Sequence, residues 1–62
     1  MTKICIADSL PVVTKGLQAY FQGNSKFEVT SVAKNLESLL SELNSKKINI
    51  LLLDVELNGL SS

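Results

Sequence analysis

Two aspartates, Asp8 and Asp54, stand where a carboxylate could do chemistry, because each directly follows a short apolar run, over residues 4–7 and 50–53. Carboxylate oxygens suit a hard divalent cation, and Mg²⁺ is commonly held by one or two carboxylates together with water. An aspartate can also act as a nucleophile that accepts a phosphoryl group. The two residues are therefore the first candidates for a metal or phosphoryl site.

A structural role must be weighed beside this one. An aspartate at the end of a strand often does no more than cap the turn or helix that follows. For a single such residue we would prefer that interpretation. Two of them favour a functional pair only if their strands are neighbours in the sheet. The interpretation of Asp8 and Asp54 thus depends on the elements that position them.

The hydrophobic pattern predicts three strands that alternate with two helices. Residues 3–8, 27–33 and 48–54 have the length and composition of strands, and the unbroken apolar run 50–53 indicates burial on both faces. This alternation predicts an α/β fold, β-α-β-α-β, with a parallel sheet. In the strand order 2-1-3 the first and third strands are neighbours. Asp8 and Asp54 would then face one crevice at the carboxyl ends of the strands, where such sheets bind ligands.

Apolar residues at helical spacing mark the first helix after Pro11, which suits a first helical position. Its stripe comprises Val13, Gly16, Leu17, Tyr20 and Phe21. We expect Gly16 to allow a close approach to the sheet and Gly23 to end the helix as a left-handed cap.

The second helix is predicted from a good N-cap residue, Asn35. A leucine stripe follows, which we expect to face the sheet as core, and Asn44 and Ser45 end the helix. The members of the stripe are Leu36, Leu39, Leu40 and Leu43.

Charge and composition exclude several classes of function. Six lysines balance six acidic residues, so the clustered positive charge of a nucleic-acid-binding protein is missing. No apolar run is longer than the four residues 50–53, which is far shorter than the roughly 20 residues of a membrane span. The N-terminus lacks the layout of a secretory signal, and a lone Cys5 suits a reducing compartment. We therefore expect a cytoplasmic globular protein with no membrane partner.

The stretches ICIADSLPVVTKGL (residues 4–17) and INILLLDVELNGL (residues 48–60) add a resemblance. In order and spacing, the chain resembles the N-terminal half of a response-regulator receiver (CheY-like) domain. It is similar in particular to receivers of LuxR-type helix-turn-helix regulators. The resemblance implies that residues 1–62 form a partial receiver domain, with strands one to three and helices one and two of a flavodoxin-like sheet.

The resemblance also implies roles for individual residues. Asp54 takes the position of the phosphoacceptor, and Mg²⁺ would be held by Asp8, by Asp54 and by the backbone carbonyl of Glu56. Gly59 matches the glycine of the loop after the third strand. Ser9 stands where the family has a second acid that normally binds the metal directly, so we expect weak Mg²⁺ binding. Ser9 could instead cap the first helix.

The function implied is that of a switch and not of an enzyme. A histidine kinase would phosphorylate Asp54 in the full-length parent, and the parent would control transcription through a DNA-binding output domain that these residues do not include. One alternative is a degenerate receiver that acts only as a protein-interaction or dimerisation module. Another is a fragment of a phosphohydrolase with an aspartate nucleophile, for which residues 54–56 are only a loose match.

The third strand suggests a partner. We expect the chain to be part of a longer one, because a receiver has five strands. If the chain folds alone, its third strand becomes an unpaired apolar edge. Two copies could then pair these edges antiparallel about a two-fold axis, which gives a six-stranded sheet of order 2-1-3-3′-1′-2′.

Overall fold

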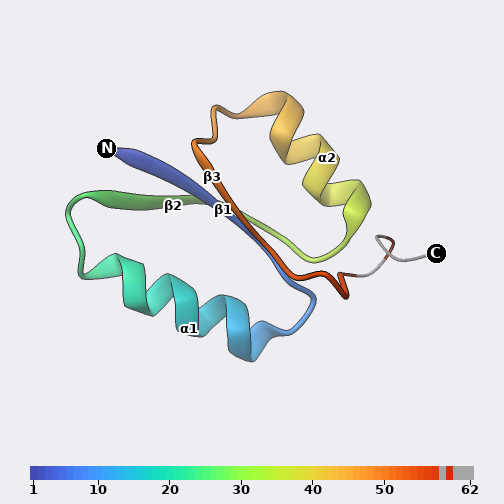
Figure 1. Ribbon diagram of the computed structural model, residues 1–62, viewed down its shortest axis with the longest axis horizontal. Helices are drawn as coiled ribbons and strands as arrows, with labels where there is room; N and C mark the ends of the chain where they lie inside the picture. The colour runs from blue at the N-terminus through green and yellow to red at the C-terminus, as the bar shows by residue number, and fades with distance from the viewer. Residues whose placement is uncertain (58, 60–62) are drawn as a thin grey trace.

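The computed structural model describes residues 1–57 and 59, which form a three-stranded sheet with one helix on each face (Figure 1). In chain order the elements are β1 (Thr2–Ala7), α1 (Pro11–Gln22), β2 (Phe27–Ala33), α2 (Leu36–Ser45) and β3 (Ile50–Leu53). The strands pair in parallel in the order β2-β1-β3. The predicted α/β fold and its strand order 2-1-3 are confirmed.

The central strand, β1, supplies much of the core, and its residues 4–7 are all buried. Successive side chains of a strand point to opposite faces of the sheet. Cys5 and Ala7 therefore share the face covered by α2, where they cluster with Ala33, Leu39 and Leu57. Ile4 and Ile6 point to the face covered by α1.

The turn after α1 is built differently from the prediction. Gly23 has φ −81° and ψ 0°, so it is not a left-handed cap. The N–H of Asn24 donates to the carbonyl of Phe21 at 3.0 Å. The side-chain Oδ1 of Asn24 accepts from the N–H of Lys26 at 2.9 Å. Because the asparagine side chain closes the turn, no left-handed glycine is needed there.

The face that α1 turns to the sheet also differs from the predicted stripe. Thr14 is buried, and its hydroxyl donates to the carbonyl of Pro11 at 3.2 Å, which removes most of the cost of burying it. Tyr20 is 74% exposed and packs edge-on against Phe21 at the surface. A Cβ at Gly16 would have no heavy atom within 4 Å, so the expected close approach to the sheet is absent there.

The second helix begins as predicted. The side-chain Oδ1 of Asn35 accepts a hydrogen bond from the N–H of Ser38 at 2.8 Å, which is an N-cap. Leu39 is buried, but Leu40 and Leu43 are 52% and 40% exposed. Only part of the predicted leucine stripe is therefore core.

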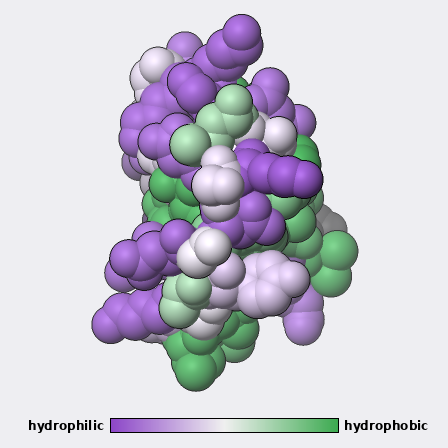
Figure 2. All heavy atoms as spheres, turned by 90° about the vertical axis from the view of Figure 1, so that its left-hand side faces the viewer, coloured by the Kyte–Doolittle hydropathy of each residue, from purple (hydrophilic) through white to green (hydrophobic). Residues whose placement is uncertain are grey.

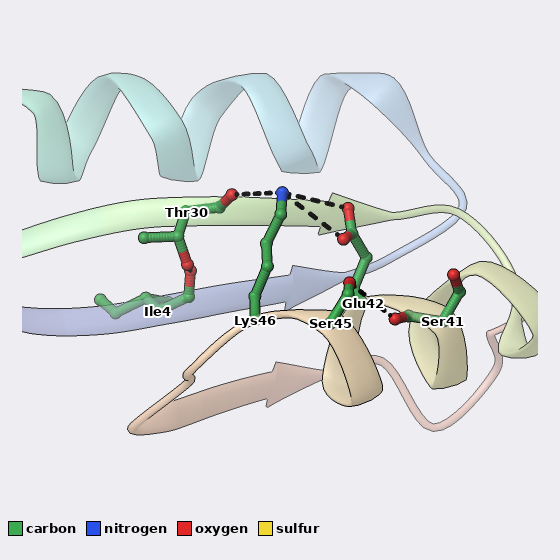
Figure 3. Close-up of polar contacts among 6 residues, drawn as sticks. All are labelled: Ile4, Thr30, Ser41, Glu42, Ser45 and Lys46. Carbon is green, nitrogen blue, oxygen red and sulfur yellow. Dashed lines mark hydrogen bonds and ion pairs between the residues drawn. The ribbon is translucent and has the colours of Figure 1, made fainter.

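A β-bulge interrupts the pairing of β1 with β2. The register shifts between Ile4 and Cys5, which leaves Thr30 as the extra residue. The Nζ of Lys46, the residue that follows α2, donates to the carbonyl of Thr30 at 3.2 Å and lies 3.4 Å from a carboxylate oxygen of Glu42 (Figure 3). The lysine thus ties the end of α2 to the bulge.

The third strand, β3, is the edge of the sheet opposite β2, and β1 is its one neighbour in the described sheet. It is shorter than the predicted residues 48–54, because a side chain takes part in the pairing at Asn49. The Oδ1 of Asn49 accepts from the N–H of Lys3, and the N–H of Asn49 donates to the carbonyl of Lys3, each at 2.9 Å. Ile50, Leu51 and Leu53 are 38%, 36% and 42% exposed. The prediction of burial on both faces is wrong, since nothing in the described chain covers this edge.

The loop after β3 returns to the core. Leu57 is fully buried in the cluster beneath α2, although the sequence pattern did not mark it as core. Its N–H donates to the carbonyl of Asp54 at 3.0 Å, which closes a turn. Gly59 has φ +90°, and a Cβ there would lie 3.1 Å from the Cβ of Leu36. This confirms a turn glycine, while its neighbour Asn58 lies outside the described residues.

The surface mixes hydrophilic and hydrophobic side chains. Figure 2, which faces the left-hand side of Figure 1, shows green hydrophobic surface among purple hydrophilic groups. Of the two helices in the described residues, neither has the length and apolar character that crossing a membrane requires.

Candidate functional site

The pairing of β1 with β3 brings Asp8 and Asp54 together. Ala7 and Leu53 are register partners at the ends of these strands, so the two aspartates that follow them are also side by side. The N–H of Asp54 donates to the carbonyl of Ala7 at 2.9 Å, which continues the pairing by one residue. Parallel neighbours of this kind are about 4.8 Å apart. The two aspartates are therefore neighbours at one edge of the sheet, as predicted.

Both aspartates line one hollow of about 250 Å³ at the carboxyl end of the sheet. Ile6 and Leu52 lie two residues before them on the same face, and Leu17 of α1 borders the hollow. Leu53 completes the lining. The lining therefore combines apolar side chains with the two aspartates.

Each carboxylate also has a structural task. The Oδ1 of Asp8 accepts from the N–H of Leu10 at 2.9 Å, and the Oδ1 of Asp54 accepts from the N–H of Glu56 at 3.0 Å. Both are turns in which the aspartate bonds the backbone two residues on. The second oxygen of each, Oδ2, makes no hydrogen bond within the described residues. The structural and the chemical roles of these aspartates are thus compatible, because they use different oxygens.

Ser9 does not cap α1. The N-cap position belongs to Leu10, whose side chain makes no capping hydrogen bond. The reason is local: the carboxylate of Asp8 takes the N–H of Leu10 and sets the turn, and Pro11 begins the helix without needing a partner for an N–H. The expectation that Ser9 caps the helix is wrong.

Glu56, unlike the two aspartates, is not among the residues that line the hollow. It is exposed in the turn after β3. Within the described chain, no group of three or more His, Cys, Asp or Glu side chains is arranged to hold a metal ion. A cation at this site would have two carboxylates and otherwise water or backbone oxygens as ligands, which is within the range that Mg²⁺ accepts.

The electrostatics of the hollow are one-sided. The described residues of its lining include two acids and no basic side chain. An anionic phosphoryl group would be repelled here unless a cation neutralised the carboxylates. The donor set therefore fits a hard divalent cation better than a bare anion.

The single cysteine has no place in this chemistry. Cys5 is fully buried on the face covered by α2, whereas the hollow opens on the face covered by α1. Burial raises the pKa of its thiol, the charge of Glu42 raises it further, and Lys46 acts in the opposite direction. A neutral buried thiol is a packing group and a poor nucleophile.

Sequence reasoning missed the apolar half of the site. It had placed Leu17 only in a core stripe and had not assigned Ile6 and Leu52 to the hollow. The available signal was the alternation of side chains along β1 and β3, because the residue two positions before each aspartate lies on the same face of the sheet.

Comparison with protein-family models, with curated proteins and with solved structures gave no match to this chain. The chain is thus a small β-α-β-α-β unit with a three-stranded parallel sheet, and no family is assigned to it.

Proposed function

We propose that this chain is the receiver part of a two-component response regulator, in which Asp54 accepts a phosphoryl group beside a Mg²⁺ ion held with Asp8. The observation that carries the proposal is the position of the two aspartates, which follow paired residues of β1 and β3 and line one hollow. The order of the sequence motifs, which resembles receivers, supports it.

The proposed step is a direct transfer of the phosphoryl group. The free Oδ2 of Asp54 attacks the phosphorus of a phosphohistidine on the kinase, and the phosphorus–nitrogen bond breaks. The leaving nitrogen keeps the bonding pair and takes a proton from water, while Asp54 becomes an acyl phosphate. A divalent cation supplies charge neutralisation for the phosphoryl oxygens. The Oδ1 of Asp54 stays on the N–H of Glu56, which orients the nucleophile.

The different roles of the two aspartates follow from the resemblance to receivers, because their surroundings are alike: the Oδ1 of each accepts from the backbone N–H two residues on, and both line the same hollow. In this assignment Asp54 accepts the phosphoryl group and Asp8 attracts and holds the cation. A longer parent would carry the signal to a DNA-binding output domain and control transcription in the cytoplasm. The net charge of zero is consistent with DNA binding elsewhere in such a parent.

A small phosphodonor tests the transfer without a kinase. The chain is incubated with acetyl phosphate and Mg²⁺, and its intact mass is measured. We expect a gain of one phosphoryl group that is lost in Asp54→Asn and slowed in Asp8→Asn. Glu28→Gln is the matched control, because it removes an exposed carboxylate that is far along the sequence from both Asp8 and Asp54. An adduct that persists in Asp54→Asn would contradict the proposal.

A second candidate function is a receiver that only binds other proteins. Ser9, which stands in place of an acid, and the uncovered apolar edge of β3 favour it. A Mg²⁺ titration separates the two functions, because a dissociation constant of about a millimolar or tighter supports phosphotransfer. No measurable binding supports the interaction module.

A further inference from the structure

Three lysines from two distant parts of the chain line one hollow at the amino end of the sheet. The hollow has a volume of about 380 Å³, and we call it the lysine hollow after Lys3 in β1 and Lys46 and Lys47 after α2. The other described residues of its lining come from β2 and are Glu28, Val29 and Thr30. Small-molecule sites commonly have volumes of about 300–1,000 Å³. The fold thus assembles a positively charged hollow of ligand size, which the order of the sequence does not reveal.

The lysine hollow is separate from the hollow that Asp8 and Asp54 line. Lys3 is the second residue of β1, whereas Asp8 follows the last one, so the two hollows lie at opposite ends of the sheet. Lys3 also shares the face covered by α2 with Cys5, two residues on, whereas the aspartates line a hollow on the face covered by α1. The strand at the lysine hollow is β2, the edge opposite β3. None of its described lining residues belongs to β3 or follows it.

The three ammonium groups are engaged to different degrees. The Nζ of Lys46 donates to the carbonyl of Thr30 at 3.2 Å and lies 3.4 Å from a carboxylate oxygen of Glu42 (Figure 3). Among the described residues, no ion pair or side-chain hydrogen bond involves the Nζ of Lys3 or of Lys47. Lys46 is therefore held in place by the protein, while Lys3 and Lys47 retain donors for a ligand.

The charge of the lining indicates the kind of ligand. Three lysines stand against one glutamate, which leaves a net charge of two positive units. A phosphate group bound through an ester carries about −1.5 to −2 charges at pH 7, so its charge complements that of the lining. A lysine ammonium acts as a point charge and lacks the planar fork with which arginine holds a carboxylate. The donor set therefore suits a tetrahedral phosphate better than a planar carboxylate.

We propose that the lysine hollow binds a phosphate dianion, either free or as a small phosphate monoester. Lys3 and Lys47 donate to the phosphate oxygens, and Lys46 adds positive charge while it stays on the carbonyl of Thr30. Because Lys46 and Lys47 are exposed and salt screens such charges, the binding is weak. We expect a dissociation constant on the order of 1 mM at low ionic strength. This inference does not depend on chemistry at Asp54.

A titration with inorganic phosphate gives the first test. The unaltered chain is freed of divalent cations with a chelating resin and titrated at about pH 8, where phosphate is a dianion. Chloride keeps the ionic strength constant, and backbone amide shifts are followed by NMR. We expect saturable shifts at residues 28–30 and 46–47, with the amides of Asp8 and Asp54 unchanged. Shifts that do not saturate, or that are equally large at the two aspartates, overturn the proposal.

Neutral replacements identify the donors. Lys3→Gln and Lys47→Gln should each weaken phosphate binding about 3- to 10-fold, whereas Lys47→Arg keeps the charge and should retain most of the affinity. Lys15→Gln, on exposed α1, is the matched control, because it removes the same charge away from the hollow and should leave the affinity unchanged. Circular dichroism checks that each variant is folded. Equal weakening by Lys15→Gln and by the two hollow variants would show a general effect of net charge and contradict a site.

Glycerol phosphate distinguishes the two sources of the ligand. The lysine hollow has Val29 and the apolar stems of the lysines in its lining, so an ester could gain contacts that free phosphate lacks. Binding of glycerol phosphate about 3-fold or more tighter than that of inorganic phosphate assigns the hollow to an ester. Equal affinities assign it to free phosphate. If neither compound shifts the amides of residues 28–30 and 46–47, the proposal is wrong.

Discussion

Asp8 and Asp54 follow directly after Ala7 and Leu53, which are register partners in adjacent parallel strands, and both aspartates line the same hollow. Two like charges thereby share one hollow at one end of a small sheet, and none of the described residues that line it is basic. Like charges in proximity destabilise a fold, so this arrangement favours a ligand that relieves the repulsion.

The repulsion predicts how stability responds to neutral replacements. Asp8→Asn keeps a side-chain oxygen for the N–H of Leu10 but removes one charge, so we expect stability to be unchanged or raised by up to about 1 kcal/mol. In the unaltered chain Mg²⁺ should raise Tm, whereas in Asp8→Asn it should have little effect. Thermal unfolding with and without the ion provides the measurement. An equal rise in Tm for both proteins would place the ion elsewhere.

Leu57 is predicted to matter more for stability than its position in a loop suggests. It is fully buried beside Cys5 and Leu39, so Leu57→Ala should cost about 2–5 kcal/mol. A chain of this size has only about 3–5 kcal/mol to lose, and the variant should be largely unfolded at room temperature. Val55→Ala, two residues earlier and 77% exposed, is the control and should change the urea midpoint little. Equal effects of the two substitutions would contradict the packing described.

The cap of α2 is a separate and smaller contribution. Asn35→Ala removes the acceptor for the N–H of Ser38 and should lower the free energy of unfolding by about 1 kcal/mol. Asn35→Asp preserves an oxygen at that position and should restore most of the loss. Urea unfolding of the three proteins tests this, and a cost in Asn35→Asp equal to that in Asn35→Ala would show that the cap is not the cause.

The alternation of elements was predictable because each segment follows a simple periodic rule. The bounds of β2 agree with the predicted residues 27–33, and the Asn35 cap was found from residue type alone. The failures are tertiary. Tyr20 has the spacing of a core residue, yet α1 is rolled so that Thr14 is buried instead. No periodicity within one helix fixes that roll, because the neighbouring strands decide it.

Burial of Cys5 gives a pH dependence of stability. Its folded pKa lies above the ordinary value of 9.0, so as pH rises past that value the unfolded thiol loses its proton first. The contribution of the thiol is complete below pH 9.0 and decreases above it. Urea unfolding between about pH 8 and pH 10 should show a steeper loss of stability in the unaltered chain than in Cys5→Ala. Because both proteins carry the same lysines, parallel losses would contradict this assignment.

The candidate site, like the fold, was predictable only in part. Strand order and the two terminal aspartates were available from the sequence, and the structure brings these residues together. The role of Ser9 was not, because the turn that Asp8 closes with Leu10 makes Leu10 the N-cap. Leu57 was missed since a residue after a strand carries no periodicity of its own.

The position of the phosphoryl group tests the central claim most directly. The chain is treated with acetyl phosphate and Mg²⁺, the acyl phosphate is reduced with borohydride to an alcohol, and peptide mass spectrometry locates the altered residue. We predict reduction at residue 54 alone, dependent on Mg²⁺ and diminished in Asp8→Asn. Modification at Asp8 or at another carboxylate, or no modification at any concentration of donor, would contradict a phosphoacceptor role for Asp54.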